Sequence, residues 1–528
     1  MAEGGNIVKR INRDFKVRNF HQAKWDEPII FELSKKGERG ILIPQAEDEI
    51  KESIGDGISV LPDNIRRKQS PDLPEISQPR VLRHYMRLSQ ETLGADVNIE
   101  IGQGTCTVKY SPKINEMLSR MPQMTELHPL QPEETVQGIL EIIHKTDMMM
   151  REISGMDRFT FQPGGGSQAV FALASIIMNY HKSKGQGKQR DEIITTIYSH
   201  PSDAAAPAVK GYRIVYIHPD EEGYPDFEAF KEAVSDRTAG FIVANPEDTG
   251  VYNPRIKEFT NLVHKVGGIC GYDQANANGL LGITRAVEAG FDMCFFNLHK
   301  TFSTPHGCGG PAVGATGVIN KLVKFLPAPL VDFDGNKYYL NYNSTRNHYS
   351  VGKIRSFIGV AQVIMKTYAW IMSLGAEGLY EVAKVAVLNN NYLFKKLMEL
   401  DCIDAPYIKG KQRIEQVRYT LKKLTEDTDI TTGDIQRRMM DFGMHYWTSH
   451  HPYYVPEPAT LEPTETPSKE DLDEYIETLK YIFKEAYENP EMIKTAPHRS
   501  VCHQVDESGM DDPDKWAITW RSYLKKYK

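Results

Sequence analysis

The chain has 528 residues, and its 63 lysines and arginines against 70 aspartates and glutamates give a formal net charge of −7 at pH 7. Hydrophobic residues make up 40% of it and charged residues 25%, which excludes intrinsic disorder for most of the chain. The acidic balance excludes the basic surface typical of nucleic-acid-binding proteins. Six cysteines without a CxxC pair favour reduced thiols in a cytoplasmic protein over a disulfide framework or a zinc ribbon.

No targeting or membrane-spanning segment is indicated. The first twenty residues lack an apolar stretch, and Glu3 and Asp14 argue against a transit peptide. The most apolar helical stretch, Ala169 to Met178, is about half the length that a spanning helix needs. We therefore expect a soluble protein that contacts no membrane, with this stretch as a buried helix.

Residues 1–130 are expected to form an N-terminal arm and extension. The segment from Leu61 to Arg80 is rich in proline and charge, which disfavours compact secondary structure. It predicts either an arm that wraps a partner or another domain, or a solvated leader, and the sequence leaves both open.

Residues 131–358 predict a large α/β domain, because helical stretches alternate with short β-branched runs. The expected helices are 132–152, 167–180, 225–234 and 254–266, and the expected strands are 192–198, 213–217, 240–246, 267–273 and 292–298. Strands separated by helices predict a parallel sheet with helices on both faces. Ligands of such sheets bind at the carboxyl ends of the strands.

Residues 359–528 predict a smaller C-terminal α+β domain with a polar tail. Helices are expected at 360–374, 379–399 and 469–488, with strand-like segments between the second and third. The tail, 489–528, is expected to lie over the body of the protein.

A glycine-rich segment, Gln162-Pro163-Gly164-Gly165-Gly166-Ser167, precedes the apolar helix. Glycines that lead into a helix N-terminus expose backbone N–H groups, which suit a phosphate. The segment matches neither a Walker loop nor the GxGxxG spacing, and by itself it is as often an ordinary turn.

Three further side chains follow predicted strands. His200 can stack on a flat ring, Asp273 can keep a pyridinium nitrogen protonated, and Lys300 can supply the free amine for an imine. Taken singly, each has a more ordinary interpretation: a surface histidine, a turn aspartate and a solvated lysine. Together with the glycine-rich segment they are the four contacts that pyridoxal 5'-phosphate requires. Their order is similar to that of the aspartate-aminotransferase-like fold, the pyridoxal-phosphate-dependent transferase fold of type I.

The segment Asn297 to Pro311, NLHKTFSTPHGCGGP, resembles the cofactor-lysine segment of the glycine decarboxylase P-protein family. The resemblance covers the chain from about residue 80 to residue 500, including the motifs RHYMRLSQ, GTCTVKYSPKINE, HPLQPEETVQG, SVGKIRSFIG and LEPTETPSKEDLD. The length and the lysine resemble subunit 2 of the two-subunit prokaryotic form of the family, glycine dehydrogenase (decarboxylating).

This resemblance implies an oxidoreductase of the glycine cleavage system that uses pyridoxal phosphate to release carbon dioxide from glycine. It implies a lysine-lacking subunit 1 in an α2β2 heterotetramer, and a lipoylated H-protein as acceptor of the aminomethyl group. The catalytic residues would be Lys300, His200 and Asp273. The implied cofactor contacts also include Gly166, Ser167, Ala275, His299 and Thr301. For the substrate carboxylate, Arg355 and Lys353 are candidate cations.

Departures from the family pattern gather where substrate is expected. Val170 replaces a usual acidic residue, and the usual His-Gly-Thr-Asn reads His200-Pro201-Ser202-Asp203 here. The usual Asn-Pro-Asn-Thr reads Asn245-Pro246-Glu247-Asp248, and Cys308 interrupts the glycine run. A related enzyme that acts on a different amino acid or acceptor is therefore the alternative to glycine. A non-catalytic scaffold is a third hypothesis, and the presence of Lys300 argues against it.

Overall fold

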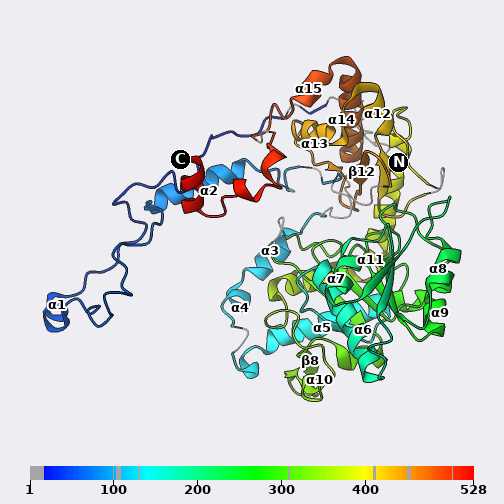
Figure 1. The fold of residues 1–528 in the computed structure, drawn as a ribbon, viewed down its shortest axis with the longest axis horizontal. Helices are drawn as coiled ribbons and strands as arrows, with labels where there is room; N and C mark the ends of the chain where they lie inside the picture. The colour runs from blue at the N-terminus through cyan, green and yellow to red at the C-terminus, as the bar shows by residue number, and fades with distance from the viewer. Residues whose placement is uncertain are drawn as a thin grey trace, which may run out of the picture. The chain divides into compact units, whose positions relative to one another are not determined.

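The structure is a computed structural model of the chain (Figure 1). It describes residues 17–18, 20–94, 96–98, 100–102, 109–128, 131–306, 310–407, 412–448, 454–501 and 504–528. The chain divides into two units, a larger one formed within 1–19 and 95–494, and a smaller one formed by 20–94 and 495–528. The bounds of the three predicted domains remain a prediction.

A seven-stranded sheet forms the centre of the larger unit, with the strand order β1-β7-β6-β5-β4-β2-β3. The strands are β1 (Arg158–Thr160), β2 (Glu192–Thr196), β3 (Arg213–Ile217), β4 (Thr238–Ala244), β5 (Ile269–Asp273), β6 (Met293–Asn297) and β7 (Gly314–Val318). Strands β2 to β6 pair in parallel, in agreement with the prediction. Strand β7 runs antiparallel to both β6 and β1, so the prediction of a wholly parallel sheet was wrong. The described residues between β6 and β7 form no crossover helix, and a return without one gives an antiparallel pair.

Both faces of the sheet are buried, because neighbouring residues of one strand enter different hydrophobic cores. Ile193 packs with helix α6 (Gly166–Ser183), whereas Ile194 packs into the core beneath the opposite face. Phe295 and Phe296 of β6 divide in the same way. This alternation is the period-two geometry of a strand that is covered on both sides. The covering helices are α5 (Gln137–Ser154), α6, α7 (Ser202–Val209), α8 (Phe227–Ala233) and α9 (Ile256–Lys265).

Helix α11 (Ala361–Leu397) joins the large domain to the small one. It was predicted as two helices, and its backbone does break helical geometry at Gly375, where φ is 65° and ψ is −174°. Residues before and just after the break pack into the core of the large domain, whereas Leu393 and Leu397 pack into a separate core. The long helix therefore gives the two domains of the larger unit a shared element. The preceding chain forms a two-stranded ribbon of β8 (Leu330–Phe333) and β9 (Tyr338–Asn341).

The small domain is an antiparallel sheet covered by helices. Its strand order is β10-β12-β11, and β12 (Pro458–Leu461) pairs with both β10 (Val417–Thr420) and β11 (Trp447–Thr448). Helices α12 (Lys422–Thr428) and α13 (Thr432–Met440) pack on α14 (Lys469–Glu488), as Figure 1 shows. A capping box between Ser468 and Asp471 starts α14 at the predicted residue.

The smaller unit brings the N-terminal arm and the C-terminal tail together. Phe31 stacks on Trp520 of α16 (Trp520–Tyr527), with ring centroids 5.2 Å apart. Glu27 binds His84 and Arg87 of α2 (Gln78–Gln90), each at 3.0 Å. No helix in the described parts of the chain combines the length and the hydrophobicity that crossing a bilayer requires.

Candidate functional site

A pocket opens at the carboxyl edge of the central sheet, where ligands of α/β sheets bind. Its lining combines residues from four strand ends with residues of the small domain: His200, Ala244, Pro246, Asp248, Asp273, Ala275, Asn276, Lys300, Glu415 and Gln416. His200 follows β2, Asp273 is the last residue of β5, and Lys300 follows β6. The structure thus brings the three expected catalytic side chains into one place.

Asp273 is a buried carboxyl group, 7% exposed, at the edge of this pocket. The Ala275 N–H donates to its Oδ1 at 2.8 Å. Burial raises the pKa of Asp273, and the nearby His200 and Lys300 act in the opposite direction. A cationic group in the pocket would offset the cost of ionising this carboxyl group.

Lys300 is held by a tight turn after β6 and is 9% exposed. The backbone N–H of Lys300 donates to the Asn297 carbonyl at 2.9 Å. The hydroxyl of the adjacent Thr301 accepts a hydrogen bond from the Ala277 N–H at 2.8 Å. Thr301 therefore ties the lysine turn to the segment that follows Asp273. This hydroxyl is already engaged within the chain, and its predicted cofactor contact stays a prediction.

His200 is held by one edge of its ring and is otherwise exposed. The Ser202 N–H donates to Nδ1 at 3.1 Å, and the Ser202 hydroxyl lies 2.7 Å from the same nitrogen. Contacts on one nitrogen leave the faces of the ring open, as stacking on a flat group requires.

The glycine-rich segment ends at the N-terminus of α6, which no side chain caps. The N–H groups of a first helical turn have no partner within the helix, so they remain available for an anion. A methyl group added at Gly166 would stand 3.0 Å from the Asn297 amide nitrogen, and one at Gly164 would collide with the Arg355 guanidinium. The segment therefore passes close to the end of β6 at Gly166, and beside the exposed Arg355 side chain at Gly164.

The predicted cofactor contacts Ser167 and His299 lie at the glycine-rich segment. Val170, which departs from the family pattern, does not face the pocket. Ser167 is exposed in the first turn of α6, and His299 lies beside Gly165. Burial, together with Lys300 and His306, lowers the pKa of His299 to about 3, so its ring is neutral. Val170 is fully buried in the core between α6 and the sheet and does not line the pocket. Cys308 lies outside the described residues.

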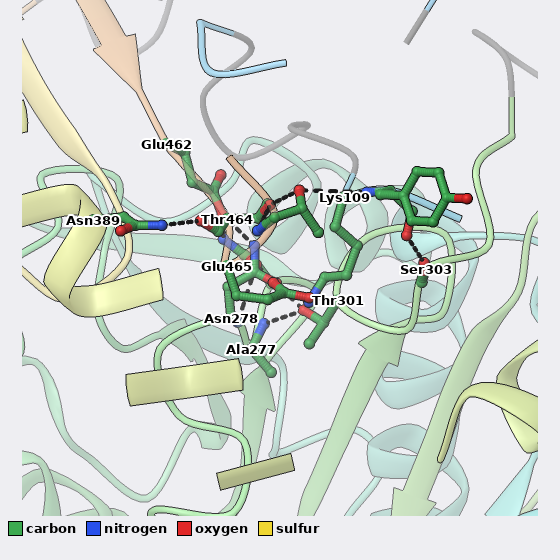
Figure 2. Close-up of polar contacts among 12 residues, drawn as sticks. Lys109, Ala277, Asn278, Thr301, Ser303, Asn389, Glu462, Thr464 and Glu465 are labelled. Atoms are coloured by element: carbon green, nitrogen blue, oxygen red, sulfur yellow. Dashed lines mark hydrogen bonds and ion pairs between the residues drawn. The ribbon is translucent and has the colours of Figure 1, made fainter. Parts of the chain in front are cut away.

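Buried carboxyl groups around the pocket were not expected from the sequence. Burial raises the pKa of Glu247 and of Glu415 to about 8 each. Glu462, just after β12, accepts hydrogen bonds from the amides of Asn276 and, at 2.7 Å, Asn278 (Figure 2). Only the motif LEPTETPSKEDLD pointed to Glu462, and it carried no local signal for a role. The pocket is therefore closed by the small domain as well as by the sheet.

The segment before α3 (Lys113–Ser119) also reaches this region, as Figure 2 shows. The fully buried Lys109 pairs with Glu465 at 2.9 Å, and its ammonium lies 4.9 Å from the centre of the Trp370 ring. The Ser303 hydroxyl donates to the Tyr110 carbonyl at 2.6 Å. These contacts fasten the chain after Lys300 to the N-terminal segment.

These residues fit pyridoxal phosphate. The pocket offers a buried carboxyl group for a ring nitrogen, an amine for an aldehyde and an imidazole for stacking. The uncapped helix end and its glycine cradle adjoin the same strand, through the contact between Gly166 and Asn297. The donor set thus meets each chemical requirement of that cofactor.

Two family models match the chain. The model described as aminotransferase class-V matches residues 160–363, and the one described as glycine dehydrogenase, C-terminal domain, matches residues 382–501. The first spans the large domain with its pocket, and the second spans most of the small domain.

Similar proteins extend over nearly the whole chain. The probable glycine dehydrogenase (decarboxylating) subunit 2 of Pyrococcus horikoshii is 42% identical over 506 residues, 96% of this chain and 98% of that protein. The protein of the same name from Caldanaerobacter subterraneus is 41% identical over 480 residues, covering 91% and 96%.

Solved structures share the fold at lower identity. An inhibitor-bound glycine decarboxylase (P-protein) of the glycine cleavage system aligns with a TM-score of 0.70 and 21% identity, over 84% of this chain and 100% of that one. A NifS-like protein aligns with a TM-score of 0.54 and 14% identity, over 72% and 98%. The predicted type I fold is confirmed.

Proposed function

The chain belongs to the glycine dehydrogenase (decarboxylating) subunit 2 family, and on this premise we propose that its pocket binds pyridoxal phosphate and decarboxylates glycine. The observation that carries the proposal is the meeting of His200, Asp273 and Lys300 in one pocket beside an uncapped, glycine-lined helix end. Membership of the family makes the chain a glycine dehydrogenase subunit with the predicted enzyme class.

The cofactor would be held from four directions. Lys300 would bind it covalently, and the His200 ring would cover one face of it. Backbone N–H groups at Gly166 and Ser167, with the neutral His299 beside them, would bind its phosphate. Pyridoxal phosphate supplies an electron sink for the electron pair that the departing carboxylate leaves behind.

Asp273 would keep a proton on the ring nitrogen of the cofactor. Its carboxylate is desolvated, so a cation at close range is strongly favoured as a partner. Ala275 fixes the other side of this carboxylate through its N–H. The residue thus maintains the protonated ring on which the electron sink depends.

The acidic lining can accept the carboxylate of an amino acid because much of it is uncharged. Glu247 and Glu415, each with a pKa near 8, hold their protons in most molecules at pH 7. Asp248 is paired with Arg418 at 3.1 Å. Arg355 lies beside Gly164, which favours the phosphate end of the site for this cation over the carboxylate role first considered.

The family name implies a partner subunit, and we propose the finer assignment. The partners would be a lysine-lacking subunit 1 in an α2β2 heterotetramer and a lipoylated H-protein that receives the aminomethyl group. A cytoplasmic location follows from the same proposal.

The test is glycine-dependent exchange of labelled bicarbonate by the chain with subunit 1, lipoylated H-protein and pyridoxal phosphate. We expect exchange by the unmodified chain and by Lys188→Ala, a control at an exposed lysine, and none by Lys300→Ala. Absence of exchange by a cofactor-loaded complex would contradict the proposal.

The alternative, action on a different amino acid, rests on Glu247 and Asp248. Asp248 lines the pocket, and Glu247 is buried next to it. A screen of amino acids for changes in the absorption of the bound cofactor separates the two functions. A response to glycine supports the main proposal, and a response to another amino acid alone supports the alternative.

A further inference from the structure

Asp203 is a fully buried carboxyl group with no hydrogen-bond donor. It is the second residue of α7, and its backbone N–H donates to the His200 carbonyl at 2.9 Å. Neither of its carboxyl oxygens receives a hydrogen bond from a described donor group. Its hydrogen-bond neighbour is another carboxyl group, that of Asp273.

Two adjacent buried carboxyl groups cannot both carry a charge at neutral pH, so they share a proton. Asp273 has the stronger claim to the charge, because the Ala275 N–H donates to it and His200 and Lys300 lie nearby. Among the described residues Asp203 has neither a donor nor a cation that favours its charge, and the charge of Asp248 acts against its ionisation. The positive end of the short helix α7 opposes this assignment, but a helix end contributes less than a direct N–H donor together with the nearby Lys300.

We propose that Asp203 is a positioning residue that stays protonated and donates its O–H to Asp273, holding that carboxylate charged and aimed at the cofactor ring. The carboxylate of Asp273 is then fixed from two sides, by the Ala275 N–H and by the Asp203 hydroxyl. The cofactor part of this inference rests on the proposed function, whereas the shared proton does not.

The arrangement depends on pH. Burial and the adjacent Asp273 raise the pKa of Asp203 well above its usual value. Loss of the proton at high pH would remove the donor to Asp273 and place a second negative charge beside it. His200, Lys300 and Asp248 are the other charged or titratable groups that act on the pair.

Two substitutions separate a donor from a mere space-filler. Asp203→Asn keeps the shape and an N–H donor, and Asp203→Leu keeps the branched shape, at a larger volume, without a donor. We expect Asn to leave the Kd of the cofactor-free chain for pyridoxal phosphate within about threefold, and Leu to weaken it about tenfold or more. An Asn variant as weak as the Leu variant, or a Leu variant equal to the unmodified chain, would overturn the proposal.

A second measurement needs no cofactor. When folding raises the pKa of a carboxyl group, the protein loses stability as pH rises above the unfolded pKa of that group. Asparagine does not titrate, so a variant with asparagine at this position does not lose this contribution. The Tm of cofactor-free Asp203→Asn minus that of the unmodified chain should therefore increase from pH 5 to pH 9. A Tm difference that does not change with pH would overturn the inference that Asp203 and Asp273 share a proton. If the unmodified chain bound no pyridoxal phosphate, the proposed function would fail, and this Tm comparison would still decide the carboxyl pair.

Discussion

Each edge of the central sheet holds a buried aspartate, and the pKa values of the two aspartates are shifted in opposite directions. Asp292, just before β6 at the amino edge, binds His264 Nε2 at 2.8 Å, Lys321 Nζ at 2.7 Å and the Cys270 N–H at 2.8 Å. Burial alone would raise the pKa of Asp292, but these partners lower it below its usual value. Asp273, at the carboxyl edge, receives one N–H, and its pKa is raised.

The difference in partners distinguishes a carboxylate with a structural role, Asp292, from one that is available to a ligand, Asp273. The partners of Asp292 all come from the chain, so its network is complete without any other molecule and contributes to stability. Asp273 has one N–H donor, the neighbouring Asp203 carboxyl group and no ion pair among the described residues, so its charge is less fully compensated than that of Asp292. Incomplete pairing at the carboxyl edge is therefore the physical mark of the site.

The largest expected effect is at the carboxyl edge. Lys300→Ala removes the amine that would bind the cofactor and should lower glycine-dependent exchange by at least about 100-fold. The Tm of the cofactor-free chain should change little in comparison, since Lys300 makes no ion pair among the described residues. Steady-state exchange assays and thermal melts of the same preparation check both parts.

The contrast between the two aspartates is tested directly by truncating each. Asp292→Ala leaves the Cys270 N–H, the His264 ring nitrogen and the Lys321 ammonium without their carboxylate partner and should lower the free energy of unfolding by about 1–3 kcal/mol. Asp273→Ala should cost no more than about 1 kcal/mol in the cofactor-free chain, because it also removes a buried charge. Urea unfolding curves measure both, and equal losses would refute the distinction.

The large domain could be predicted well because its strands are short apolar runs between helices. Strand β3 begins and ends at the predicted residues, β4 lies two residues earlier than predicted at both ends, and β5 begins two residues later than predicted and ends at the predicted residue. Helix α7 was not expected, because its eight residues include Pro207 and follow a turn-like His-Pro pair. Strand β7 was not assigned, since its GATGV sequence lacks the apolar pattern of a strand.

The site could be predicted only as far as its local motifs reached. His200, Asp273 and Lys300 each follow a strand, so their meeting at one sheet edge follows from the topology. The contacts of Asn278 with Glu462 and of Gly164 with Arg355 join residues almost 200 positions apart. No local spacing carries such pairs, because tertiary packing within the large domain and between the two domains creates them.

A pH-dependent effect sharpens the comparison at the carboxyl edge. Burial raises the pKa of Glu247 from its usual 4.5 to about 8, so the native protein holds a proton there that the unfolded chain loses. Stability from this group therefore falls as pH rises from about 4.5 to about 8. Glu247→Gln, which keeps an acceptor for the Thr196 hydroxyl, should gain up to a few kcal/mol over the unmodified chain across this window.

The amino edge should respond with the opposite sign. The pKa of Asp292 is lowered by folding, so its contribution is present above its unfolded pKa and is lost as pH falls through the folded value. As pH rises from 3 to 8, the free energy of unfolding of the unmodified chain should therefore increase relative to that of Asp292→Asn. Over the same range it should decrease relative to that of Glu247→Gln. Urea unfolding between pH 3 and pH 8 compares the two.

The smallest expected effect concerns the glycine cradle. Gly164→Ala places a methyl group against the Arg355 guanidinium, which is exposed and free to shift. The Kd for pyridoxal phosphate should rise by only about threefold, well under 1 kcal/mol. In an Arg355→Ala background the same glycine substitution should have no further effect, and an undiminished loss there would show that the arginine is not the obstacle.

Reduction of the cofactor-loaded chain with borohydride, followed by peptide mapping, tests the central claim most directly. The account predicts a single pyridoxyl group on the peptide that contains Lys300, and none on Lys300→Ala treated in the same way. A modified lysine elsewhere in the unmodified chain, or no stable modification at all, would contradict the assignment of this pocket as the cofactor site.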